Sequence, residues 1–79
     1  MNKILLIRFS SIGDLVLTTP VIRALSQQLP GIEIHFLTKK RFISILESNP
    51  YLAKIHSFEE SLQEVIPILK HEKFDLIID

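Results

Sequence analysis

Apolar residues gather in short runs that are separated by longer amphipathic stretches. The runs Ile4 to Phe9 and Phe74 to Asp79 are almost continuously apolar, a pattern typical of strands covered on both faces. Ile32 to Thr38 alternates apolar and polar residues before turning apolar, and it also predicts a strand. Ala53 to Phe58 is a weaker strand candidate. No run approaches the roughly 20 apolar residues that span a bilayer.

The stretch DLVLTTPVIRALSQQLPG, residues 14–31, has helical periodicity. Pro30-Gly31 ends this helix, and Pro20 predicts a kink or an irregular first turn because proline forfeits a backbone hydrogen bond. Its predicted inward stripe consists of Leu17, Val21, Leu25 and Leu29.

Two further helices are predicted. KKRFISILESNP, residues 39–50, is a shorter helix with Phe42, Ile45 and Leu46 inward, and Asn49-Pro50 stops it. The stripe of the third helix consists of Leu62, Val65, Ile66 and Leu69. Its capping box pairs either Ser57 with Glu60 or Ser61 with Glu64. Pro67 lies within the stripe and predicts a break.

The alternation of strands and helices predicts a fold class. The order is β-α-β-α-β-α-β, which favours right-handed βαβ units and a three-layer α/β domain with a Rossmann-like parallel sheet. A chain of 79 residues suffices for one small domain, residues 1–79. It stops at Asp79, on an apolar strand that would need a covering helix, so we expect a piece of a longer protein.

Composition narrows the class of protein. The chain is 47% hydrophobic with nine basic and nine acidic residues, which is typical of a folded chain. Zero net charge argues against a general nucleic-acid binder. The absence of cysteine excludes disulfides and thiolate metal sites. Arg8 follows the first apolar run without a cleavage site, which indicates a strand and not a signal peptide.

The stretch RFSSIGDLVLTTP, residues 8–20, forms the turn from the first strand to the first helix. In open α/β sheets, ligands bind beyond the carboxyl ends of the strands, where this turn lies. Gly13 allows a positive φ or a close backbone approach, and the helix amides attract anions. The motifs GxGxxG and GxxxxGK[ST] are both absent, so dinucleotide and P-loop interpretations have little support.

Two interpretations of Asp14 stay open from local features. It is either an N-cap, which is the commoner use of such an aspartate, or a general base that accepts a proton from an attacking hydroxyl. The basic turn Lys39-Lys40-Arg41 follows the second strand at the same edge. It either holds phosphates of a substrate or forms a solvated helix start.

The quoted segments resemble a known family. ILLIRFSSIGDLVLTTPVIRAL resembles the opening of glycosyltransferase family 9 proteins, the lipopolysaccharide heptosyltransferases and their relatives. PGIEIHFLTKKRFISILESNPYLAKIHSF and KFDLIID are similar to the continuation of that family. The resemblance implies the GT-B architecture, with two Rossmann-like halves. This chain would begin the N-terminal, acceptor-side half, and the C-terminal donor-binding domain would be absent.

The resemblance also implies a function. Asp14 matches the family's proposed catalytic base, and Ser10, Ser11 and Gly13 match the loop around it. The reaction would be inverting transfer of a heptose or related sugar from an ADP-sugar to a lipid-linked lipopolysaccharide acceptor, with no metal and no cofactor. The isolated chain would be inactive. A cytoplasmic location follows, with peripheral contact at the inner face of the inner membrane left open.

Other residues have simpler interpretations. The three histidines lack metal-ligand spacing and are given structural roles, with His35 and His56 at polar-facing strand positions and His71 on an exposed helix end. Asp79 ends a strand at the ligand edge, whereas Asp75 lies at the opposite edge and is structural. Arg8 either faces the same cleft or, as the commoner outcome, reaches solvent. Thr18 and Thr19 could line the cleft, but packing or backbone bonding is their ordinary use. The competing class is a Rossmann-like nucleotide- or phosphate-binding module without transferase activity.

Overall fold

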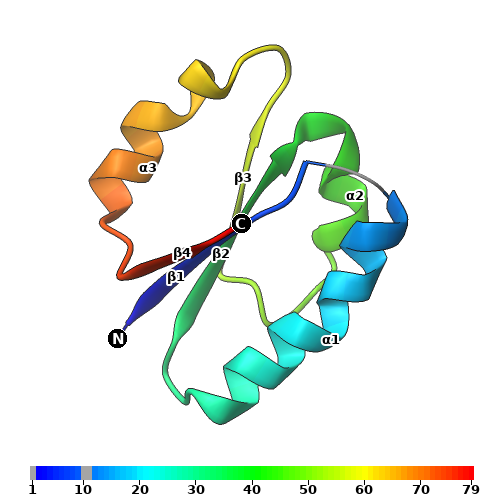
Figure 1. The fold of residues 1–79 in the computed structure, drawn as a ribbon, viewed down its shortest axis with the longest axis vertical. Coiled ribbons are helices and arrows are strands. Elements are labelled where there is room, and N and C mark those ends of the chain that lie inside the picture. Colours follow the sequence, from blue (N-terminus) through cyan, green and yellow to red (C-terminus); the bar gives the residue numbers. More distant parts are fainter. Residues whose placement is uncertain (1, 10–11) are drawn as a thin grey trace.

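The computed structural model describes residues 2–9 and 12–79 and contains a four-stranded parallel sheet with helices on both faces (Figure 1). The strands are β1 (Lys3–Ile7), β2 (Glu33–Lys39), β3 (Lys54–Phe58) and β4 (Leu76–Ile78). The helices are α1 (Ile12–Gln28), α2 (Ile43–Leu46) and α3 (Ile66–Glu72), with short 3-10 turns η1 (Lys40–Phe42) and η2 (Leu62–Glu64). The predicted parallel α/β fold is confirmed.

The spatial order of the strands is β3-β2-β1-β4. The central strand β1 pairs with β2 on one side, with Leu5 opposite His35, and with β4 on the other, with Leu5 opposite Ile77. Because all pairs are parallel, the carboxyl ends of the four strands lie at one edge of the sheet. The β1–α1 turn and the β2–η1 turn both leave from that edge.

The alternation of side chains along the strands divides the core in two. Helices α1 and α2 cover one face of the sheet, and α3 covers the other (Figure 1). The buried residues beneath α1 and α2 are Ile4, Leu6, Leu15, Ile22, Ile34, Phe36, Phe42 and Leu46. Those beneath α3 are Leu5, Leu37, Phe58 and Val65. Most of the apolar burial therefore lies under α1 and α2.

The predicted inward stripe of α1 is wrong at Leu17, Val21 and Leu29, and only Leu25 packs against the core. Leu17 and Val21 are 70% and 53% exposed, whereas Leu15 and Ile22 are fully buried and Leu25 is half-buried. An α-helix turns by roughly 100° per residue, so Leu17 points away from the face that carries Leu15. The helix continues through Pro20 to Gln28, and it ends before Gly31, whose φ of 84° favours glycine.

The other two helices are shorter than predicted. The second divides into η1 and α2, which bury Phe42 and Leu46 as expected. The third is interrupted at Val65, between η2 and α3, and Pro67 lies in the first turn of α3, where its missing N–H costs no helical bond. The capping box uses Ser61 and Glu64.

Candidate functional site

Asp14 lies in the first turn of α1, at the carboxyl edge of the sheet. The helix begins at Ile12, so the interpretation of Asp14 as an N-cap is wrong: the carboxylate is already inside the helix. A negative charge in this turn interacts favourably with the positive end of the helix dipole.

A cavity of about 280 Å³ opens in front of Asp14. Arg8 and Asp79 line it together with Asp14, and they come from the ends of β1 and β4. Its apolar wall includes the exposed side chains of Leu17, Val21 and Ile78. The cavity therefore combines charged groups at the sheet edge with an apolar surface from α1 and β4.

Of the two alternatives for Arg8, the structure shows the less expected one, because its side chain lines this cavity. Its Nη2 lies 3.6 Å from Asp14 Oδ2, and the two side chains are 45% and 48% exposed. An ion pair that is this exposed contributes only roughly 0–1 kcal/mol, so it adds little to the stability of the fold. The sequence did not predict this pairing, because the conformation of the chain between residues 8 and 14 does not follow from the residue types alone.

The remaining residues of the predicted loop have mixed outcomes. Ser10 and Ser11 lie outside the described residues. Gly13 is part of α1 and is not among the described glycines with positive φ, so of the two expected uses of this glycine only a close backbone approach stays open. A Cβ placed on Gly13 would meet nothing within 4 Å. The backbone there is open to the approach of a ligand.

The basic turn lines a separate cavity of about 400 Å³ at the ends of β2 and β3. Lys39, Lys40 and Arg41 share this cavity with Glu59 and Glu60, and not with Asp14. Lys40 Nζ donates to Glu59 Oε1 at 2.8 Å, which raises the pKa of Lys40. A phosphate would have to displace Glu59 from this contact. The assignment of the turn to substrate binding remains a prediction.

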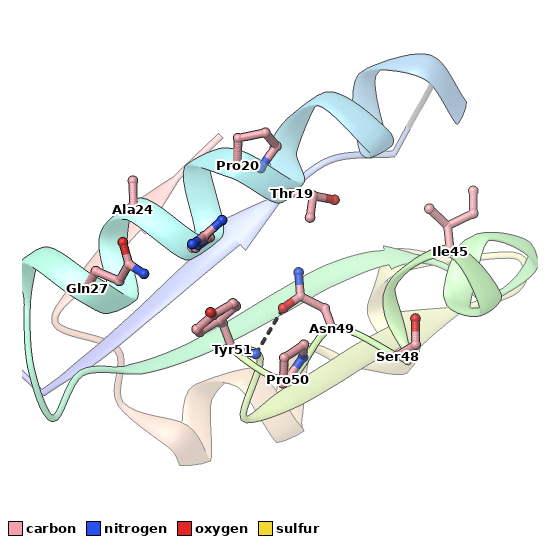
Figure 2. A pocket seen from close by; sticks show the side chains of 10 residues that line it. Thr19, Pro20, Ala24, Gln27, Ile45, Ser48, Asn49, Pro50 and Tyr51 are labelled. Carbon is pink, nitrogen blue, oxygen red and sulfur yellow. Dashed lines mark hydrogen bonds between the residues drawn. The ribbon is translucent and has the colours of Figure 1, made fainter.

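A cavity of about 590 Å³ lies between α1 and the turn before β3, away from Asp14 (Figure 2). The Asn49 side chain accepts a hydrogen bond from the Tyr51 N–H at 2.9 Å, while its own Nδ2 is buried with no partner in the described residues. The cavity is also lined by Thr19, Gln27 and Ser48. Sequence reasoning did not single out this groove.

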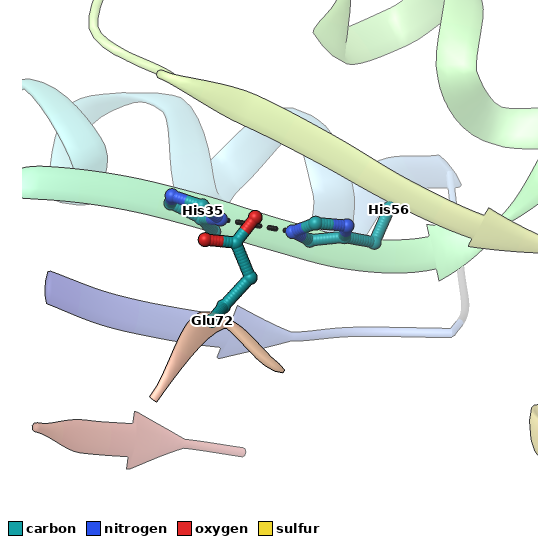
Figure 3. A group of neighbouring side chains, drawn as sticks. All are labelled: His35, His56 and Glu72. Carbon is teal, nitrogen blue, oxygen red and sulfur yellow. Dashed lines mark hydrogen bonds between the residues drawn. The ribbon is translucent and has the colours of Figure 1, made fainter. Parts of the chain in front are cut away.

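The two strand histidines are buried and meet each other on the α3 face (Figure 3). His35 Nδ1 and His56 Nε2 are 2.8 Å apart, and His35 Nε2 lies 2.6 Å from Glu33 Oε2. The expectation that these histidines lie at polar-facing positions of their strands is wrong, because both are buried on the face that α3 covers. Burial, and then the neighbouring His35, lowers the pKa of His56.

Glu72 completes this group. Its carboxylate accepts from Lys54 Nζ at 2.9 Å and from Lys3 Nζ at 3.0 Å, and these bonds lower the pKa of Glu72 to about 2. Single ligand atoms of His35, His56 and Glu72 all lie within 4.8 Å of one another. The fold thus brings together side chains from β2, β3 and the end of α3. Their spacing along the sequence did not predict that they would form a cluster.

Other interpretations agree with the structure. Thr18 Oγ1 donates to the Leu15 carbonyl at 2.6 Å, the backbone bond expected for it. Asp75 is structural, because its Oδ2 accepts the N–H groups of Asn2 and Lys3 at 2.8 and 2.9 Å. His71 is exposed as predicted. Among the described residues, no helix has the length and apolarity needed to cross a membrane.

The parallel sheet with helices on both faces defines the chain as an α/β domain, and a charged cavity lies at the carboxyl edge of the sheet, where ligands of open α/β sheets usually bind. Lipopolysaccharide heptosyltransferase 1 of Campylobacter coli is 28% identical over 68 residues, covering 86% of this chain and 20% of that protein. Lipopolysaccharide heptosyltransferase 3 of Escherichia coli is 30% identical over 77 residues, covering 85% of this chain and 23% of that protein. No protein-family model matches the sequence.

Two solved structures share the fold. A glycosyl transferase family 9 structure from Veillonella parvula has a TM-score of 0.88 at 21% identity, covering 98% of this chain and 25% of that one. Heptosyltransferase WaaC of Escherichia coli with ADP has a TM-score of 0.78 at 20% identity, covering 98% of this chain and 27% of that one. Together these matches confirm the resemblance to glycosyltransferase family 9 proteins of the heptosyltransferase type. The chain spans about a fifth to a quarter of the length of these relatives.

Proposed function

We propose that this chain begins the acceptor-side half of a GT-B glycosyltransferase that transfers a heptose or related sugar from an ADP-sugar to a lipid-linked lipopolysaccharide acceptor. The observation that carries the proposal is Asp14, held at the ligand edge of the sheet in a cavity with Arg8 and Asp79. The heptosyltransferase relatives support the reaction class, and the ADP in the structure of WaaC supports the donor.

Asp14 would act as the general base. As the bond between the anomeric carbon and the diphosphate oxygen breaks, the acceptor oxygen bonds to that carbon from the opposite face. Asp14 takes the hydroxyl proton, and the diphosphate leaves with the bonding electron pair. A carboxylate is a weak base towards an alcohol, so proton transfer has to accompany bond cleavage, and positioning supplies much of the rate. Arg8, whose Nη2 lies 3.6 Å from Asp14 Oδ2, would contribute to the position of the carboxylate.

The proposal includes a second, donor-binding domain beyond this chain, which would make the 79-residue chain inactive alone. Support comes from the lengths of the relatives and from Leu76, Ile77 and Ile78, which are 39%, 57% and 39% exposed on β4. In the longer protein, further chain would cover these apolar side chains. We place the protein in the cytoplasm, with the acceptor presented at the inner face of the inner membrane.

The deciding experiment replaces Asp14 by Asn in the full-length protein. Asparagine keeps the shape of the side chain and removes the base, so kcat falls by about 10²–10⁴-fold while the KM for the donor stays within about 3-fold. Initial rates with ADP-heptose and a lipopolysaccharide acceptor measure this. Glu47→Gln, at an exposed carboxylate after α2, is the matched control and retains the wild-type rate. Near-normal turnover of Asp14→Asn would contradict the assignment.

The same protein distinguishes the transferase from a phosphate- or nucleotide-binding module. A transferase is stabilised against thermal unfolding by an ADP-sugar and consumes it when the acceptor is added. A binding module is also stabilised by the nucleotide, but it transfers no sugar to the acceptor.

A further inference from the structure

We propose that His35, His56 and Glu72 form a structural site for a zinc-type divalent metal ion on the face of the sheet that α3 covers (Figure 3). Two imidazoles and a carboxylate are ligands that Zn²⁺ prefers in proteins. The site lies on the opposite face of the sheet from α1, which carries Asp14. The ion would therefore take no part in sugar transfer, and the proposal does not depend on the proposed function.

The hydrogen bonds of His35 leave its Nδ1 without a proton of its own, so a metal ion could take the lone pair that Nδ1 now offers to His56. An ionised carboxylate only accepts, so Glu33 Oε2, at 2.6 Å, holds the proton on His35 Nε2. The lone pair of His35 Nδ1 then faces His56 Nε2, at 2.8 Å, with one proton between them. A carboxylate behind a ligating imidazole is the usual outer partner at zinc sites, where it fixes the ring and its tautomer.

The geometry requires all three side chains to adjust, because their ligand atoms now lie within 4.8 Å of one another and a tetrahedral site holds ligand atoms closer than this limit. Metal–nitrogen bonds of about 2.0–2.1 Å in a tetrahedral site separate two ligand nitrogens by roughly 3.3 Å. The present separation of 2.8 Å between His35 Nδ1 and His56 Nε2 would have to widen by about 0.5 Å as the ion replaces the shared proton. The proton leaves that nitrogen of His56 and moves to its Nδ1. Glu72 supplies the third ligand, and water completes the tetrahedron.

Two lysines compete with the ion for Glu72. Lys54 donates to Glu72 Oε2 at 2.9 Å, but its side chain is 61% exposed, so it can turn into solvent at small cost. Lys3 is 26% exposed and lies 3.7 Å from Glu33 Oε2, which gives it a second acidic partner when Glu72 turns to the metal. The affinity for the metal ion therefore depends on how strongly the two lysines hold Glu72. Removal of Lys54 should strengthen metal binding.

The site would join three elements. His35 lies on β2, His56 on β3, and Glu72 is the last residue of α3. Immediately afterwards, Lys73 has a left-handed φ of 56° and turns the chain towards β4. An ion bound here would hold the end of α3 on the sheet and raise the thermal unfolding temperature.

The test uses the full-length protein after removal of metal by a chelator. Zn²⁺ titration by calorimetry, and Co²⁺ titration by visible absorption, should each show one saturable site, with Co²⁺ giving tetrahedral bands. Because His35 is fully buried, the deciding variants are Glu72→Gln and Lys54→Met. We expect Glu72→Gln to weaken Zn²⁺ binding by at least about 10-fold, the lower bound for losing even an outer partner of a ligand. Lys54→Met should bind more tightly than the wild type.

The matched control is His71→Ala, which removes an exposed histidine beside Glu72 and should leave the affinity unchanged. The proposal is overturned if the wild type shows no saturable binding, or if Glu72→Gln binds Zn²⁺ as tightly as the wild type. Equal losses in Glu72→Gln and His71→Ala would also overturn it, because they would place the ion on the exposed helix end.

Discussion

At the scale of single residues, environment and not residue type decides what the polar side chains do. Asp14, Asp75 and Glu72 are all carboxylates in or beside a helix or strand end. Asp14 faces a cavity, Asp75 holds two backbone N–H groups, and Glu72 receives two lysines. From position along the chain alone, we predicted that Asp14 lies at the ligand edge of the sheet and that Asp75 is structural. The partners of Glu72 come from β1 and β3, far away in sequence, and could not be predicted.

Replacement of the two glycines by alanine should change the stability of the protein in opposite directions. Gly31 has φ of 84°, so Gly31→Ala should destabilise the protein by about 1 kcal/mol. Gly13 lies in α1 with open space where a Cβ would project, so Gly13→Ala should stabilise it by up to about 1 kcal/mol. Urea unfolding of both variants measures these differences. If Gly13→Ala is more stable but a slower transferase, the open space above residue 13 is used by substrate; destabilisation by Gly13→Ala would contradict the helical geometry.

At the scale of elements, strands were easier to predict than helices. Buried parallel strands read as apolar runs, and all four lie within about two residues of their predicted bounds. Two of the predicted helices each divide into a 3-10 turn and a short α-helix, η1 with α2 and η2 with α3. The sequence only partly predicts where these divisions fall. The choice of Ser61 over Ser57 for the capping box was settled because Ser57 lies within β3.

The capping box provides a prediction for the start of η2. Ser61 Oγ accepts the Gln63 N–H at 3.2 Å, and Glu64 accepts the N–H groups of Glu59, Glu60 and Ser61. Ser61→Ala should therefore cost about 1 kcal/mol of unfolding free energy. Glu64→Gln should also destabilise the protein, while Glu60→Gln, from the box that did not form, should not. Chemical denaturation measures all three, and equal effects of Glu60→Gln and Glu64→Gln would contradict the assignment.

At the scale of the whole molecule, Asp75 connects the two ends of the chain. Its carboxylate accepts the N–H groups of Asn2 and Lys3, and it precedes β4, which pairs with β1. The backbone bond from Asn2, and then the one from Lys3, lowers the pKa of Asp75 below its ordinary value of 3.8. The ionised form is thus favoured by folding.

This linkage predicts how stability depends on pH. A group whose pKa is lowered on folding stabilises the native state above its unfolded pKa, and that contribution disappears as pH falls through the folded pKa. Asp75→Asn should therefore be less stable than the wild type at pH 7, and the difference should shrink below about pH 4. Unfolding midpoints from pH 7 to pH 2 test this. A difference that stays constant across the range would show that ionisation of Asp75 is not involved.

The sequence by itself determined the parallel α/β class, the strand positions and the placement of Asp14 at the sheet edge, because these depend on local periodicity and on the turn after β1. Only the tertiary structure decided the order β3-β2-β1-β4, the buried face of α1, the pairing of Arg8 with Asp14, and the meeting of His35, His56 and Glu72. These features depend on which distant residues become neighbours. Sheet pairing and helix packing set those contacts, and no spacing along one chain records them.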